Sequence, residues 1–215
     1  MAFFRRTSLL GILFLLSAWR VHGERKPVAM GLVGGLNGTS YWGKDIGEFD
    51  INMWPTTGFT FTLHLPAFLG LEADLLYSSK SSSYRTYPSG KIKVNNIKDH
   101  SLEMPLMLKV TAPTENEVQP IFFGGPSVAY LVSKETYSTI INVEGGGLVV
   151  PEDTAPPIPT QNMVDYELSL ALGGGVEWGL GSLQMRFNFG GQSLDKTHQA
   201  DVRTFVVAIM AGFIF

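Results

Sequence analysis

The residues of this chain that could do chemistry recur at every second position of otherwise apolar segments. Eight charged residues fall on the polar side of this alternation: Glu72, Asp74, Glu103, Lys109, Asp165, Glu167, Glu177 and Arg186. Six carboxylates and two cations on one face can form ion pairs, with some carboxylates neutral or bridged by water. We interpret them as a structural polar network, with a narrow proton or cation path as the alternative.

Histidine offers little for catalysis or metal binding. Beyond residue 23 the chain contains His64, His100 and His198, without H-x-x-H or H-E-x-x-H spacing, so metal ligation is not expected. His64 shares a face with threonines and is expected to be buried and hydrogen-bonded. His100 precedes Ser101 and His198 follows Thr197. Neither pair places a His and a Ser on the outward face of one strand, as a membrane-embedded lipid-modifying enzyme would need. No catalytic, metal-binding or cofactor-binding residue is assigned, and the chain is not expected to be an enzyme.

The first 23 residues have the organisation of a secretory signal peptide. Arg5 and Arg6 form a basic start, residues 9–19 are apolar, and Val21-His22-Gly23 offers a cleavage site before Glu24. An apolar stretch of this length is too short to span a bilayer as a helix. An uncleaved membrane anchor is the alternative. The remaining residues, 24–215, are enough for one all-β domain.

Composition narrows the class of protein further. The chain has no cysteine, so an exported domain must be stabilised by its core or by a membrane rather than by disulfides. The net charge of -3 gives no basic surface for nucleic acid. With 24 glycines, 12% aromatic and only 16% charged residues, the composition suits a barrel-like β fold. After residue 23, no run of about 20 apolar residues predicts a membrane helix.

An alternation with a period of two is the strongest structural signal. In residues 58–65, Phe59, Phe61 and Leu63 alternate with Thr60 and Thr62, a pattern that is typical of a strand with two unlike faces. Eight segments predict strands, near residues 27–37, 58–65, 69–77, 101–111, 120–133, 164–178, 182–190 and 204–215. The facing of 120–133 is ambiguous, and the preferred outer residues are Phe122, Val128, Tyr130 and Val132.

The connections between these strands alternate in length. Long polar connections are predicted at about 38–57, 78–99, 134–163 and 191–202, and short ones at 66–68, 112–119 and 179–181. Outer-membrane barrels have short periplasmic turns and long extracellular loops. The predicted fold is therefore an all-β, eight-stranded antiparallel up-and-down transmembrane β-barrel with both termini in the periplasm. Because eight strands leave a lumen that side chains fill, no open pore is expected.

The last predicted strand ends on aromatic residues. Phe205, Phe213 and Phe215 share one face of 204–215, whereas the termini of soluble domains usually fray. Phe213 and Phe215 are expected to serve assembly and closure of the barrel. The expected partners are outer membrane lipid and the barrel assembly machinery.

Four short motifs resemble the PorT-like outer membrane β-barrel family of Bacteroidetes-type bacteria. They are Leu102-Glu103-Met104-Pro105-Leu106-Met107-Leu108-Lys109, Phe123-Gly124-Gly125-Pro126 followed by Tyr130, Gly173-Gly174-Gly175-Val176-Glu177 with the strand through Arg186, and Gly212-Phe213-Ile214-Phe215. The resemblance covers about residues 27–215 and implies an eight-stranded barrel in the outer membrane of a Gram-negative bacterium. One type of member takes part in protein secretion, which makes a secretion complex a candidate partner, while most members have no assigned activity.

Three functions compete on these observations. The preferred one is an integral outer membrane protein with a structural, loop-mediated binding or secretion and assembly role, and with no nucleic-acid partner. The second is a soluble exported ligand-binding barrel of lipocalin type, which has an apolar interior and a polar exterior. The third is a membrane-embedded lipid-modifying enzyme. The terminal Phe215 and the sorted loop lengths favour the first.

Overall fold

The computed structural model describes residues 27–42, 49–66, 68–86, 91–142, 152–154, 163–195 and 202–215. These residues form nine strands: β1 (Val28–Trp42), β2 (Phe49–His64), β3 (Leu69–Thr86), β4 (Lys91–Thr111), β5 (Val118–Asn142), β6 (Glu152–Thr154), β7 (Tyr166–Trp178), β8 (Gly181–Gly190) and β9 (Arg203–Ile214). The predicted signal peptide, residues 1–23, lies outside the described residues. No helix in the described ranges is long and apolar enough to cross a membrane.

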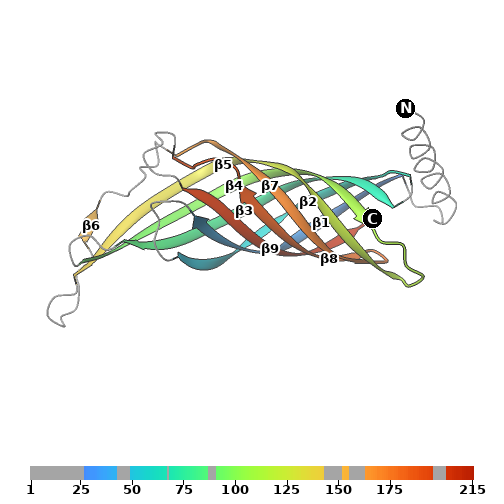
Figure 1. Cartoon of the computed structure of the whole chain (residues 1–215), viewed down its shortest axis with the longest axis horizontal. Coiled ribbons are helices and arrows are strands. Elements are labelled where there is room, and N and C mark those ends of the chain that lie inside the picture. Colours follow the sequence, from blue (N-terminus) through green and yellow to red (C-terminus); the bar gives the residue numbers. More distant parts are fainter. Residues whose placement is uncertain are drawn as a thin grey trace, which may run out of the picture.

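The strands form one closed antiparallel barrel. Neighbours in the sheet follow the order β4-β3-β2-β1-β9-β8-β7-β5-β6, and β4 also pairs with β5, which closes the ring. Eight strands therefore form the wall, because the three-residue β6 only adds to the far part of β5, where Ser138 lies opposite Thr154. Figure 1 shows the strands inclined to the long axis of the barrel. The predicted eight-stranded up-and-down barrel is confirmed.

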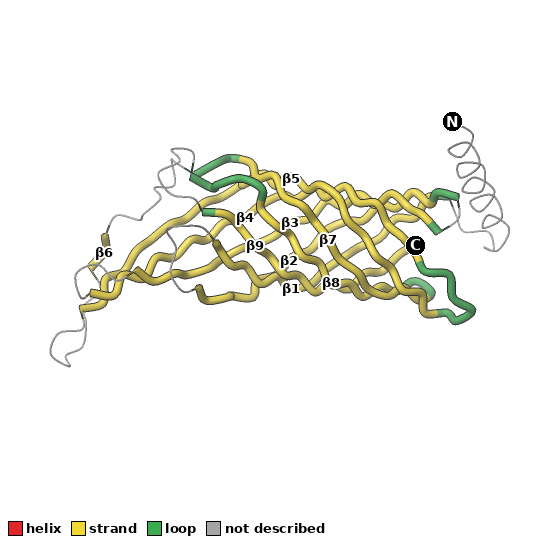
Figure 2. The backbone as a smooth tube through the Cα atoms, viewed as in Figure 1, coloured by secondary structure: helices red, strands yellow, loops and turns green. Residues whose placement is uncertain are grey.

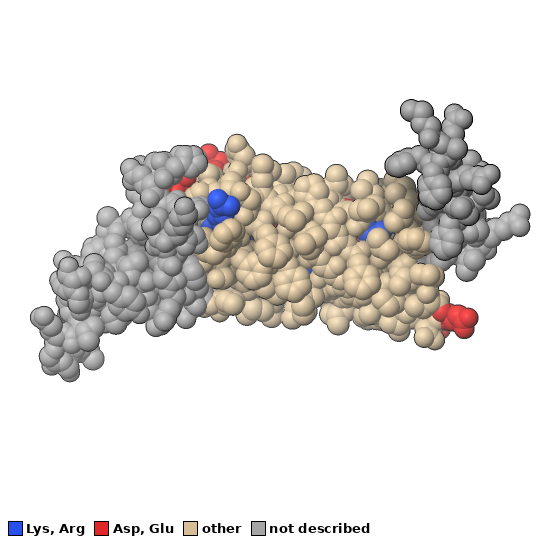
Figure 3. All heavy atoms as spheres, in the orientation of Figure 1, with Lys and Arg blue, Asp and Glu red and all other residues tan. Residues whose placement is uncertain are grey.

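Alternate residues of each strand face opposite environments. In β4, Leu102 and Leu106 are 39% and 46% exposed, whereas Glu103 and Lys109 are 5% and 2% exposed. Figure 3 shows the outer wall as a largely uncharged band between the two ends of the barrel. The outer residues preferred for 120–133 do lie on this wall: Phe122, Val128, Tyr130 and Val132 are all exposed. A charged interior and an apolar exterior are the reverse of a soluble lipocalin-type barrel, which excludes that alternative.

Three adjacent strands are longer than the sequence pattern predicts. β3, β4 and β5 have 18, 21 and 25 residues, and their far parts stay paired, with Thr86 opposite Lys93 and Lys91 opposite Asn142. We call residues 81–86, 91–98 and 135–142 the β3–β5 extension, which projects beyond the other strands in Figure 2. The predicted loops 78–99 and 134–163 are therefore partly strand, as is 38–57, where β1 continues to Trp42 and β2 begins at Phe49.

The loss of the sequence signal in these segments has a physical cause. Inside a bilayer, one face of each strand must be apolar, so the residues alternate. Beyond the lipid both faces can be polar, and the backbone hydrogen bonds continue without an apolar alternation to mark them. Segments rich in Ser, Lys and Asn, such as 78–99, then resemble loops in sequence although they are strands.

The two ends of the barrel differ. The β2–β3, β4–β5 and β7–β8 connections are short and lie at the same end as the C terminus (Figure 1). The β7–β8 turn contains Gly179 with φ 51°, a left-handed conformation that favours glycine. We call this the short-turn end and the opposite one the long-loop end.

The C-terminal strand closes the barrel against β1. The Phe215 N–H donates to the Met30 carbonyl at 2.8 Å, and the Met30 N–H donates back to the Phe215 carbonyl at 3.3 Å. Phe213 and Phe215 lie on the outer wall, 52% and 58% exposed, with their ring centroids 6.3 Å apart. Their predicted role in assembly stays a prediction, while their position at the seam of the ring is a feature of the fold.

Close approach between neighbouring strands requires glycine at Gly35 in β1. A Cβ added there would overlap the Ile209 carbonyl oxygen of β9 and lie 2.8 Å from the Met210 Cα. Both contacts are with backbone, which cannot move aside without disturbing the ladder that joins β1 to β9. The adjacent Gly34 has no such constraint, since its nearest neighbour would be the Thr57 hydroxyl at 3.7 Å.

We expect Gly35→Ala to destabilise the folded barrel by about 1–3 kcal/mol, the usual cost of overpacking. Gly34→Ala is the matched control and should stay within about 0.5 kcal/mol of the wild type. Urea unfolding in detergent, followed by the heat-modifiable mobility of the folded barrel on gels, measures both. Equal stabilities for the two variants would show that β1 and β9 do not approach as closely as described.

Candidate functional site

Charged side chains fill the lumen in connected layers. Nearest the long-loop end, Lys80 Nζ lies 2.7 Å from Glu103 Oε1 and 3.7 Å from Glu167 Oε2. All three side chains are almost completely buried. Asp99 is buried beside them and interacts electrostatically with Lys80. One ammonium group therefore faces three carboxylates in this layer.

A second layer is built around Arg186 in the middle of the barrel. Its Nη2 lies 2.8 Å from Asp74 Oδ2 and 3.8 Å from Glu72 Oε1. The guanidinium also lies 5.3 Å from the centroid of the Phe123 ring, within the range of a cation–π contact. Arg186 Nη2 donates a further hydrogen bond to Gln184 Oε1 at 3.3 Å. The planar guanidinium thus holds polar and aromatic groups from three strands.

Lys109 forms the third layer, nearest the short-turn end. Its Nζ donates to Glu72 Oε2 at 2.9 Å and also to Glu177 Oε1. Thr62 donates its hydroxyl to the same Glu72 oxygen at 3.3 Å. Glu72 therefore links the Lys109 layer to the Arg186 layer, and the two layers form one continuous network.

The electrostatic balance of this interior is acidic. Among the described residues, the layers contain six carboxylates (Glu72, Asp74, Asp99, Glu103, Glu167 and Glu177) and three cations (Lys80, Lys109 and Arg186). Charges buried in a medium of low dielectric must be paired or neutralised, because desolvation costs several kcal/mol for each ion. Each cation contacts at least two acidic side chains, so the network is crosslinked rather than a set of isolated pairs.

The structure places seven of the eight sequence-derived residues in this network and leaves out Asp165. The Asp165 side chain is 59% exposed at the start of β7 and pairs with Lys134 Nζ at 2.6 Å. β7 begins at Tyr166, so Asp165 precedes the strand and its side chain does not follow the inward face. Sequence reasoning missed Lys80 and Asp99, which continue the inward positions of β3 and β4 beyond the predicted strand ends.

An apolar cluster closes the lumen above the Lys80 layer. Tyr41, Leu131, Met163, Leu194 and Val202 form it and are all at least 96% buried. Backbone hydrogen bonds hold its segments together, since the Val164 N–H donates to the Leu194 carbonyl at 2.9 Å and the Leu194 N–H to the Val202 carbonyl at 2.7 Å. Tyr41 connects this cap to the charged layers because it interacts with Asp99.

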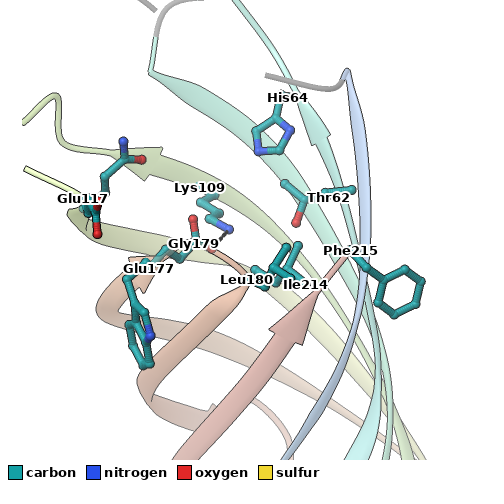
Figure 4. Close-up of a pocket in the computed structure, with 12 residues that line it drawn as sticks. Thr62, His64, Lys109, Glu117, Glu177, Gly179, Leu180, Ile214 and Phe215 are labelled. Atoms are coloured by element: carbon teal, nitrogen blue, oxygen red, sulfur yellow. Dashed lines mark hydrogen bonds and ion pairs between the residues drawn. The ribbon is translucent and has the colours of Figure 1, made fainter. Parts of the chain in front are cut away.

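A cavity of about 340 Å³ lies at the opposite, short-turn end. The inward-facing Thr62, Lys109 and Glu177 line it, together with His64 and Glu117. Figure 4 shows Lys109 bonded to the neighbouring Glu177, with His64 and Glu117 farther from this pair among the lining residues. Charged side chains thus occupy the middle of the lumen, an apolar cluster caps it at the long-loop end, and a cavity opens at the short-turn end.

A serine–histidine contact on the outer wall was not foreseen from the sequence. Ser79 Oγ lies 2.9 Å from His100 Nδ1, on adjacent strands, and the His100 ring stacks on Tyr77 at 5.9 Å. Sequence reasoning paired His100 with Ser101, which instead points inward and donates to Glu103 at 3.3 Å. Ser79 is only 6% exposed, so an ester carbonyl has little access to its hydroxyl. Among the described residues no carboxylate orients His100 as a catalytic triad requires.

Side chains that could ligate a metal ion are not clustered in the described part of the chain. No group of three or more His, Cys, Asp or Glu side chains there is arranged to hold a metal ion. His64 lines the short-turn cavity with its ring partly buried. The arrangement of the charged residues therefore supports ion pairing as their chemistry.

Comparison with known proteins gives the family. Residues 20–195 match the family described as outer membrane protein beta-barrel domain. No curated protein matches the sequence. The match names outer membrane barrels in general, and the PorT-like resemblance stays a prediction.

Several solved structures match the chain at low sequence identity. Neisserial surface protein A is 11% identical, with a TM-score of 0.44 over 87% of this chain and 97% of that chain. OprG from Pseudomonas aeruginosa is 15% identical, with a TM-score of 0.44 over 90% and 98%. Outer membrane protein W from E. coli is 17% identical, with a TM-score of 0.43 over 90% and 100%.

We expect Lys80→Met to destabilise the barrel by about 3–5 kcal/mol, because it leaves buried carboxylates without their cation. Lys134→Met is the control, since its pair with the exposed Asp165 is worth about 1 kcal/mol or less. Chemical unfolding in detergent compares the two. Adding Glu103→Gln to Lys80→Met should restore part of the loss, and equal effects of the two lysine variants would contradict a buried Lys80 network.

Proposed function

Because the chain belongs to the outer membrane protein beta-barrel domain family, we propose that it is a non-conducting barrel that binds another protein at its extracellular end. It is a transmembrane β-barrel of the outer membrane of a Gram-negative bacterium. Short turns of such barrels face the periplasm, so the long-loop end is extracellular. The proposal assigns no catalytic activity to the chain.

The filled lumen is the observation that carries the non-conducting part of the proposal. An ion crossing the barrel would have to pass the Lys109, Arg186 and Lys80 layers and then the apolar cap around Tyr41. The side chains of Lys80, Lys109 and Arg186 are at most 4% exposed, which supports a lumen that is blocked by side chains. Eight-stranded barrels generally have a lumen that side chains fill.

The β3–β5 extension supports a binding role. It carries a paired three-stranded surface beyond the rest of the barrel, longer than a transmembrane strand of about 9–11 residues requires. The part of a strand that lies beyond the lipid does not contribute to membrane insertion. We therefore infer that the β3–β5 extension functions outside the cell. A secretion complex is the form of partner that the PorT-like resemblance implies.

The proposed partners also include outer membrane lipid and the barrel assembly machinery. Arg203 lies 5.2 Å from the Trp42 ring, and Lys98 lies 5.3 Å from the Trp54 ring. Aromatic residues flank the apolar band of outer-membrane barrels at both interfaces, and cations held there suit anionic lipid headgroups. We propose that Phe213 and Phe215 in the last strand are recognised by the barrel assembly machinery.

A planar bilayer containing the purified protein should show no steady conductance above the background. The physical reason is that the layered ion pairs and the apolar cap would interrupt a water column through the barrel. A porin inserted under the same conditions is the positive control. Reproducible conductance steps from the wild-type chain would overturn the non-conducting part of the proposal.

A photo-reactive residue at Glu135 or Ser83, both in the β3–β5 extension, should form the same protein adduct on intact cells. Leu170 is the matched control, because it is 48% exposed on the apolar wall of the barrel and faces lipid. Gel mobility and mass spectrometry of the adducts give the measurement. No adduct at either extension site, or the same adduct from Leu170, would remove the support for binding at the extracellular end.

A further inference from the structure

The cavity at the short-turn end has walls of two different chemistries. Lys109 of β4, Gln119 of β5 and Glu177 of β7 contribute a polar wall. Ala29 of β1, Leu180 of the β7–β8 turn and Ile214 of β9 contribute an apolar wall. Figure 4 shows Leu180 and Ile214 beside each other, apart from Glu117 across the cavity. A ligand that contacts both walls must itself have a polar and an apolar part.

Together with Glu117 at the rim, the polar wall carries an excess of negative charge. The ammonium of Lys109 already pairs with the carboxylates of Glu72 and Glu177. Its positive charge is therefore neutralised and would attract a further anion only weakly. Glu117 lies at the rim and is exposed, and among the described residues no hydrogen bond or ion pair engages it. The Glu177 side chain keeps 15% of its surface accessible.

The layer beneath the cavity adds to this acidity. Glu72 is buried below Thr62 and Lys109, both of which line the cavity and contact its Oε2. Its second oxygen, Oε1, accepts no hydrogen bond from the described residues, and the Arg186 Nη2 stands 3.8 Å away. An anion would meet three carboxylates here, whereas a cation would be attracted by all of them.

The size of the cavity fits a small ligand. Its volume of about 340 Å³ falls within the range of roughly 300–1,000 Å³ that small-molecule sites occupy. Sites of this kind combine an apolar lining with a few converging polar groups. The cavity therefore has the features of a binding site and not only those of an unfilled barrel mouth.

We propose that this cavity binds a primary ammonium group on a short apolar stem, with Glu117 and Glu177 contacting the ammonium and Leu180 and Ile214 contacting the stem. A free alkylamine and the side chain of a lysine on a periplasmic peptide share this chemistry. The site lies at the opposite end from the β3–β5 extension. Binding here is therefore independent of the proposed extracellular partner, and either proposal can fail alone.

Nuclear magnetic resonance of the folded barrel in a non-ionic detergent tests the proposal. The backbone amides of Ala29 and Gly179, both in the lining, report binding, while amides of the long-loop end report non-specific effects. Titration with n-butylammonium at pH 8, where an ordinary imidazole is neutral, should shift the lining amides in a saturable way. n-Butanol and butyrate, which keep the stem and lose the positive charge, should bind at least about tenfold more weakly, because charge-assisted contacts are the stronger ones.

The variants separate the cavity from the surface around it. Glu117→Gln should weaken n-butylammonium binding by roughly five- to tenfold. Glu115→Gln, which removes an exposed carboxylate from the same turn but outside the lining, should leave binding unchanged. Because Glu117 is exposed, neither substitution should affect folding, and unchanged heat-modifiable mobility verifies this.

A second probe identifies the source of the ammonium. Nα-acetyl-lysine amide should bind more tightly than n-butylammonium if the natural ligand is a peptide side chain, and more weakly if it is a free amine. Either order supports the proposal. It is overturned if n-butylammonium gives no saturable shift, if butyrate binds as well as the amine, or if Glu115→Gln and Glu117→Gln have equal effects.

Discussion

Closure of the hydrogen-bonded ring is the constraint on which the rest of the structure depends. Lipid offers no partner for a backbone N–H or C=O, so each strand must be paired on both sides. Pairing of β4 with β5 and of β1 with β9 removes every free edge from the membrane-spanning wall. A ring of only eight strands is also narrow, which brings inward side chains of strands that are not neighbours, such as Lys80 of β3 and Glu167 of β7, within reach of each other.

The narrow lumen in turn dictates the chemistry of the interior. Because side chains alternate along each strand, the outward residues contact lipid. The inward residues are mostly polar and are buried in the lumen. Lys80, Lys109 and Arg186 are thus surrounded by carboxylates from other strands. These bonds tie the walls together across the lumen and also occupy the space that a channel would need. The same ion pairs therefore support both the stability of the barrel and its proposed lack of conductance.

The two ends of the barrel are suited to different tasks. At the long-loop end, the apolar cap around Tyr41 lies above the charged layers, and the β3–β5 extension continues past it as a paired three-stranded surface. At the short-turn end, the ladder stops at tight turns and the last inward side chains do not fill the opening, which leaves the cavity beside Glu177. The proposed protein partner and the proposed ammonium ligand thus contact surfaces of different size and charge at opposite ends of the barrel.

The sequence by itself determined the fold class, the facing of the residues within the lipid and most of the buried charges. A period of two is a local property of the sequence. It is present in segments such as 58–65 because one face of each membrane-spanning strand must be apolar. Only the tertiary structure decided which residues meet, because contacts across the ring depend on register between strands far apart in the chain. The link from Lys109 through Glu72 to Arg186, the contact of Ser79 with His100 and the short-turn cavity are all of this kind. The length of β3, β4 and β5 was also hidden, since outside the lipid nothing requires an apolar face and the pattern ends before the strand does.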